Sequence, residues 1–61
     1  MKQYTLTAFD AKGTKLLDEK FEAASDDEAK QIGTDKLTEK DALHTTHRLV
    51  NSVGKLLLFR P

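Results

Sequence analysis

The sequence predicts an α+β fold with the element order ββαββ, in which a four-stranded mixed sheet carries one helix on one face. Three observations support this prediction: apolar and polar residues alternate near the N-terminus, a capped amphipathic segment occupies the middle, and one turn motif occurs twice. The two copies of the motif are DAKG at 10–13 and NSVG at 51–54. A chain of 61 residues has the length of a single domain, which we place at 1–61.

Two strands are expected in the first part of the chain. Residues 2–9, KQYTLTAF, alternate with period two, as a half-buried strand does. Residues 15–23, KLLDEKFEA, carry charges that favour an edge position, where they discourage pairing with other chains. If the loop of this hairpin is one residue longer than that of the second hairpin, the apolar residues of both strands share one face. Those residues are Tyr4, Leu6, Ala8, Leu17 and Phe21.

The middle of the chain has the signals of a helix that ends near Lys40. Ser25 and Glu28 form a capping box, and two aspartates between them add negative charge at the positive end of the helix dipole. The apolar stripe of the helix includes Gly33, which costs about 1 kcal/mol in a helix relative to alanine. We expect Gly33 either to let the helix approach the sheet closely or to end the helix early.

Residues 46–51, THRLVN, and 55–60, KLLLFR, are expected to form a second hairpin. In the two turns, Asp10 or Asn51 should accept a hydrogen bond from a backbone N–H group, and the glycine of each motif should adopt a positive φ. The alternative for Gly13-Thr14-Lys15 is a phosphate loop. Such a loop needs more glycines and a helix directly after it, so we favour the hairpin turn.

The composition of the strands predicts their order in the sheet. The last strand is apolar without alternation, which is typical of a central strand covered on both faces. With the charged second strand at an edge, the order becomes 2-1-4-3, and the first and last strands are parallel neighbours. This element order resembles the β-grasp arrangement of the immunoglobulin-binding domain of protein G. Two separately paired hairpins in the order 1-2-3-4 are the alternative.

One helix cannot cover every apolar side chain of such a sheet. We expect the uncovered face to include Phe9, Leu16 and some members of a set of three: Val50, Leu56 and Leu58. An exposed apolar patch of this kind is typical of an interaction site. The sequence therefore predicts a non-enzymatic protein-interaction module that self-associates or binds a protein partner through its open sheet face.

The composition narrows the class of protein. The absence of cysteine excludes disulfides and zinc sites built on thiolates, and no cofactor is expected. The N-terminus has no unbroken apolar run like that of a signal peptide, and no segment has the length of a membrane span. We therefore expect a cytoplasmic protein with no membrane partner.

Charge is distributed unevenly, although the net charge is zero. All ten acids lie between Asp10 and Asp41, whereas residues 44–61 contain three cations and no acid. The predicted strand order brings the end of the first strand, the start of the third and the end of the fourth to one edge of the sheet. A possible binding edge gathers there, consisting of Asp10, Lys12, Lys15, His44, His47, Arg48 and Arg60.

The residues of this edge are also compatible with three other functions. His44 and His47 have the spacing of two metal ligands, but no third ligand is obvious. Asp10 could orient His47 for catalysis, but no positioned nucleophile accompanies them, so we do not expect an enzyme. Binding of an anion or nucleic acid by Lys12, Lys15, His47, Arg48 and Arg60 is the main alternative, with Phe9 and Phe59 as stacking surfaces. A net charge of zero makes nucleic acid the less favoured partner.

Three short motifs carry a family resemblance over the whole chain. They are Phe9-Asp10 after the first strand, His47-Arg48-Leu49 in the third strand, and Gly54-Lys55-Leu56 in the last turn. In these motifs the chain resembles the YhzD-like family of small bacterial proteins. The resemblance implies a cytoplasmic protein of spore-forming bacteria and no particular activity.

Overall fold

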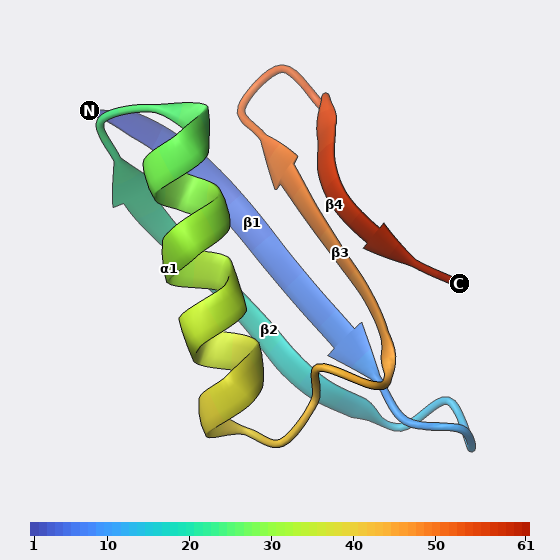
Figure 1. Ribbon diagram of the computed structural model, residues 1–61. Helices are drawn as coiled ribbons and strands as arrows, with labels where there is room; N and C mark the ends of the chain where they lie inside the picture. The colour runs from blue at the N-terminus through green and yellow to red at the C-terminus, as the bar shows by residue number, and fades with distance from the viewer.

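The computed structural model describes all residues, 1–61, and confirms the predicted α+β class and the element order ββαββ (Figure 1). One helix lies on one face of a four-stranded sheet. The elements are β1 (Lys2–Phe9), β2 (Lys15–Ala23), α1 (Asp26–Glu39), β3 (Thr46–Asn51) and β4 (Leu56–Arg60).

The strand order is β2-β1-β3-β4, and every neighbouring pair is antiparallel. The predicted order 2-1-4-3, with its mixed sheet and its β-grasp-like pairing of the first and last strands, is therefore wrong in detail. The alternative order 1-2-3-4 is also wrong. β1 and β3 are the central pair, and β4 lies at an edge beside β3 alone (Figure 1). Antiparallel pairing is slightly more stable per residue than parallel pairing, which favours β3 over β4 as the partner of β1.

A bulge in β4 explains why an edge strand is apolar without alternation. Val50 pairs with Leu56, but Leu49 pairs with Leu58, so Leu57 is the extra residue. Leu57 and Leu58 both pack against the core beneath the helix, whereas Leu56 is 46% exposed. The apolar run therefore reflects a local shift in register, since a bulge breaks the alternation of side chains between the two faces.

The two turns have the same hydrogen-bond pattern. Oδ1 of Asp10 accepts hydrogen bonds from the N–H groups of Lys12 and Thr14, both at 2.9 Å. Oδ1 of Asn51 accepts from the corresponding N–H groups two and four residues later, at 3.1 and 2.8 Å. Gly13 and Gly54 have φ values of 83° and 86°. The hairpin interpretation of both motifs is confirmed. The segment that follows Gly13 is the strand β2, whereas a phosphate loop is followed directly by a helix.

In the first hairpin the predicted sharing of one face is confirmed, but the longer loop expected to produce it is absent, because the two loops have the same length. A bulge between Ala8 and Phe9, with Leu16 as the extra residue at 39% exposure, produces the register instead. Tyr4 pairs with Phe21 and Ala8 with Leu17, so the apolar residues of β1 and β2 share the helix side of the sheet. When the two turn motifs are aligned, Thr7 corresponds to Arg48, and these two residues are themselves paired across β1 and β3. The two hairpins are thus related by an approximate two-fold axis that passes through the Thr7–Arg48 pair.

The core lies between α1 and the sheet. Its buried apolar side chains are Tyr4, Leu6, Ala8, Leu17, Ala23, Ala29, Leu37, Ala42 and Leu49. Gly33 is buried in the middle of α1, and a Cβ atom there would lie 3.3 Å from Cδ2 of Leu49. The helix continues past Gly33 to Glu39, so this glycine permits close approach and does not end the helix.

Both ends of α1 are capped. Ser25 is the N-cap, and its Oγ accepts a hydrogen bond from the Glu28 N–H at 3.2 Å. At the other end, Asp41 adopts a φ of 55°, and the Ala42 N–H donates to the Leu37 carbonyl at 2.7 Å. This is the Schellman arrangement, in which one residue in the left-handed conformation reverses the chain. Together with the hairpin turns, these caps direct the chain so that one sheet face receives the helix.

Candidate binding hollow on the open face

The sheet face opposite α1, here called the open face, carries the other set of alternating side chains. On the two central strands these side chains are Gln3, Thr5, Thr7, Phe9, Thr46, Arg48 and Val50. On β4 the face includes Leu56 and Phe59, which are 46% and 52% exposed. The prediction of apolar residues on this face is correct for Phe9, Val50 and Leu56. Leu58 instead faces the helix, near Gly33, because the bulge shifts it to the core side.

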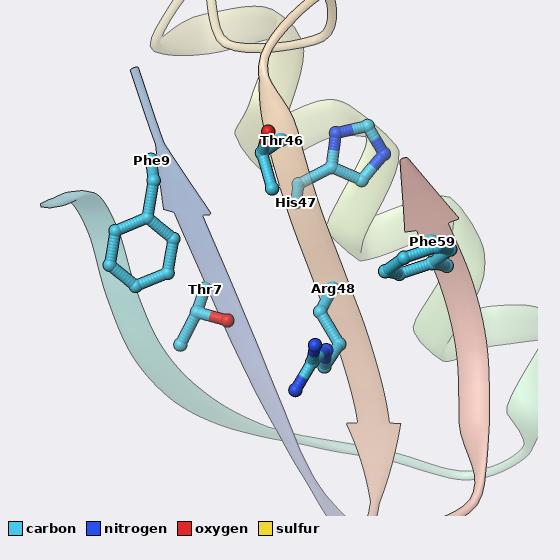
Figure 2. Close-up of a pocket in the computed structure, with 6 residues that line it drawn as sticks. All are labelled: Thr7, Phe9, Thr46, His47, Arg48 and Phe59. Atoms are coloured by element: carbon cyan, nitrogen blue, oxygen red, sulfur yellow. The ribbon is translucent and has the colours of Figure 1, made fainter. Parts of the chain in front are cut away.

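A shallow hollow of about 220 Å³ lies on the open face where β1, β3 and β4 run side by side. Its lining residues are Thr7, Phe9, Thr46, His47, Arg48 and Phe59 (Figure 2). Thr7, Arg48 and Phe59 form one row across the three strands. In the close-up, Phe9 and Phe59 stand on either side of Arg48. The hollow thus presents one cation between two aromatic rings.

Arg48 supplies the positive charge of the hollow. Its guanidinium lies 5.9 Å from the centroid of the Phe59 ring, which is a cation–π distance. The ion pairs of the chain are Lys15 with Asp18 and Lys36 with Glu19, so Arg48 has no acidic partner. An arginine that is stacked on a ring and free of acids has its five donors available to a ligand.

Asp10 and His47, the pair considered for catalysis and not favoured, make no hydrogen bond with each other. Oδ1 of Asp10 accepts two hydrogen bonds from backbone N–H groups of its own turn. His47 is only 9% exposed, on the helix side of the sheet, and its Nδ1 lies 2.9 Å from the Thr45 carbonyl. Since a carbonyl can only accept, Nδ1 carries a proton and donates to it. His47 therefore contributes to the hollow from β3, next to Arg48, and has a structural hydrogen bond.

The other residues of the predicted binding edge lie at the expected end of the sheet, but they do not form one surface. Lys12 is exposed in the first turn, and Lys15 forms a 3.0 Å ion pair with Asp18. Arg60 pairs with His47 in the sheet, and its Nε donates to the His44 carbonyl at 3.0 Å. The end of β1, the start of β3 and the end of β4 still lie at one end of the sheet. The observed order differs from the predicted one only by exchanging β3 and β4, and this exchange does not change the direction of either strand. The sheet itself separates Arg48 from Arg60.

Sequence reasoning did not identify Thr7 and Thr46 as site residues. The signal was available, because period-two alternation puts Thr7 on the same face as Phe9 and Thr46 on the same face as Arg48. The predicted strand order did not pair β1 with β3, and it is this pairing that sets Thr7 opposite Arg48. No group of three or more His, Cys, Asp or Glu side chains gathers as a possible metal site. The single helix is too short and too polar to cross a membrane.

These features define a small α+β protein with a helix on one face of its sheet and a cationic, aromatic hollow on the other. A model of the YhzD-like protein family matches residues 1–61. A protein of Bacillus subtilis (strain 168) described as "Uncharacterized protein YhzD" is 49% identical over 59 residues, which are 97% of each chain. The chain therefore belongs to the YhzD-like family, as the three short motifs indicated. No solved structure matches it significantly.

Proposed function

We propose that this protein is a non-enzymatic protein-interaction module that self-associates through the open face of its sheet. The observation that carries the proposal is the exposure of Leu56 and Phe59 on a face that no helix covers. A chain of 61 residues buries only a small core, so further apolar burial between two copies would add to a marginal stability.

The size of the open face fits an interface between two copies. The molecule measures 33 by 21 Å along its two longer axes. A flat face of these dimensions offers at most about 700 Å² per copy, close to the roughly 800 Å² per partner of a standard interface. A dimer would cover most of the face, including its apolar residues.

The row of the open face that contains Arg48 is complementary to itself across a two-fold axis that runs parallel to the strands. One cross-strand row reads Asp18, Thr7, Arg48 and Phe59 from β2 to β4. Such an axis sets the β2 side of one copy over the β4 side of the other. The acidic end of the row then lies over the aromatic end, and Asp18 of the second copy is offset sideways from Arg48 by one strand spacing, across the gap between the two sheets. This complementarity supports association with a second copy of the chain.

Two observations support a role outside catalysis. Oδ1 of Asp10 accepts from two backbone N–H groups and Nδ1 of His47 donates to a carbonyl, so these two atoms are engaged in hydrogen bonds with the backbone and not with each other. Nucleic-acid binding has less support, because the cations of the predicted edge are divided between the two faces and Lys15 is paired with Asp18.

Sedimentation over a wide range of protein concentration, into the millimolar, tests the proposal. We expect the average mass to rise from monomer to dimer, and Phe59→Ser to shift the midpoint to higher concentration. The matched control is Val53→Ser, because Val53 is 85% exposed in the second turn and outside the open face. A wild-type protein that stays monomeric throughout, or an equal effect of the two variants, would contradict self-association through this face.

A further inference from the structure

From the geometry of the hollow we infer that it is a carboxylate-binding site, specific for a carboxylate joined to an aromatic or aliphatic group. This inference rests on the proposed function, because the hollow belongs to the open face, and it names the chemical group that the face would recognise. The donors are those of Arg48, and the apolar walls are Phe9 and Phe59 (Figure 2).

The size of the hollow limits its ligand to about the dimensions of one side chain. A volume of about 220 Å³ is below the roughly 300–1,000 Å³ of pockets that enclose drug-sized ligands. A nucleotide or a large cofactor would extend far beyond it. A short acid with one ring or a short aliphatic chain would fill it.

The charge of the hollow favours a monoanion. Arg48 is unpaired, and the nearest acid in its cross-strand row, Asp18, is two strands away and already paired with Lys15. A guanidinium binds a carboxylate in a planar, bidentate geometry, with two parallel N–H···O hydrogen bonds. With a single such cation, the hollow has little to neutralise the second charge of a phosphate dianion.

The remaining polar groups also lack partners. The hydroxyls of Thr7 and Thr46 make no hydrogen bond within the chain. Thr7 lies opposite Arg48 on β1, and Thr46 lies two residues before Arg48 on the same face of β3. A bound carboxylate has lone pairs for such donors as well as for the guanidinium. The ring of Phe59 restricts the guanidinium beforehand, which lowers the entropy lost on binding.

An NMR titration of the whole protein with phenylacetate tests the inference. We expect amide shifts confined to strand positions around Thr7, Phe9, Arg48 and Phe59, and binding about tenfold weaker for the neutral analogue phenylacetamide. Arg48→Gln should weaken phenylacetate binding by about the same factor. The matched control is Arg60→Gln, which removes an arginine bonded to the His44 carbonyl, outside the hollow, and should leave binding unchanged. Urea unfolding of each variant establishes that it is folded.

Several results would overturn the inference. They are equal binding by wild type and Arg48→Gln, equal losses in the two arginine variants, or inorganic phosphate binding as tightly as phenylacetate. The last result would mean that the aromatic walls contribute nothing. Failure here is distinguishable from failure of the proposed function, because a protein that dimerises in sedimentation yet does not bind phenylacetate contradicts only the inference.

Two arms of the experiment identify the source of the carboxylate. If it comes from a second copy, excess phenylacetate should dissociate the dimer, and Asp18→Asn should weaken both self-association and the Lys15 ion pair. If it comes from a free acid, phenylacetate should bind at protein concentrations where the chain is monomeric, and Asp18→Asn should leave self-association unchanged. Either result supports a carboxylate site at Arg48.

Discussion

The Tyr4 hydroxyl donates a hydrogen bond to Oδ1 of Asp26 at 2.9 Å, and this contact joins the start of β1 to the first turn of α1. The Tyr4 side chain is fully buried, and its ring stacks on Phe21 of β2 with 5.8 Å between centroids. Nζ of Lys36 lies over the Phe21 ring, 5.8 Å from its centroid, and forms a 2.9 Å ion pair with Glu19. One chain of contacts therefore fastens the helix to both strands of the first hairpin.

We predict that Tyr4→Phe lowers the free energy of unfolding by an amount typical of one charge-assisted hydrogen bond. The ring and its stacking remain, but Asp26 loses a buried donor. Urea denaturation measures the change, with Asp27→Asn as the control for removing charge at the same end of the helix. No loss of stability in Tyr4→Phe would mean that water replaces the tyrosine hydroxyl at no cost.

The same contact predicts a pH dependence. Burial, and then the hydrogen bond to Asp26, raise the pKa of Tyr4 above its ordinary value of 10.0. The folded state therefore holds the phenolic proton more tightly than the unfolded state does. The resulting stability is complete below pH 10.0 and is lost as the pH rises through the folded-state pKa. Stability should fall more steeply above pH 10.0 in wild type than in Tyr4→Phe, and parallel curves would refute this assignment.

Position 33 should tolerate alanine, which adds one methyl group, but not the larger side chain of valine. In Gly33→Ala, a gain of about 1 kcal/mol in helix propensity opposes the displacement of Leu49, whose Cδ2 would lie 3.3 Å from the new Cβ. We expect little net change. Gly33→Val should lose about 2 kcal/mol through overpacking. Lys30→Ala and Lys30→Val, at an exposed position of α1, measure propensity alone, and an equal Ala-to-Val difference at both sites would exclude overpacking.

Asp41 occupies a position that suits glycine. Its φ of 55° is in the left-handed region, and its negative charge lies at the negative end of the helix dipole. Asp41→Gly should therefore raise the free energy of unfolding by about 1 kcal/mol. Thermal unfolding of this variant, compared with Asp41→Ala, separates backbone strain from charge. If alanine stabilises as much as glycine, charge and not backbone conformation is the cause.

The two turns should respond alike to loss of their capping side chain. Asp10→Ala and Asn51→Ala each remove two hydrogen bonds from backbone N–H groups, at a cost of about 1–2 kcal/mol. Asp10→Asn should be nearly neutral, because Asn51 makes the same contacts in the second turn. Chemical denaturation tests all three variants. A large loss in Asp10→Asn would show that the negative charge, and not the geometry, stabilises the first turn.

The candidate site was only partly predictable. Arg48 and the aromatic residues Phe9 and Phe59 were identifiable from the charge asymmetry and the strand-end positions. The grouping of Arg48 with His47 and Arg60 in one binding edge was less useful, because alternate residues of a strand point to opposite faces. The hollow exists only because β1 and β4 both flank β3, which sets residues distant in sequence in one row.

The amino-acid sequence by itself determined the helix with its caps, the two turns, the extent of each strand and the register of the first hairpin. These features depend on hydrogen bonds and side-chain periodicity within a few residues, so local chemistry is sufficient to specify them. Only the tertiary structure decided that β3 pairs with β1 and that β4 lies at the edge. Strand order depends on which long-range pairing buries the most apolar surface beneath one helix. The bulge at Leu57 removes the alternation that would have marked β4 as an edge strand, and the pairing of β3 with β1 leaves β4 at the edge with Phe59 exposed.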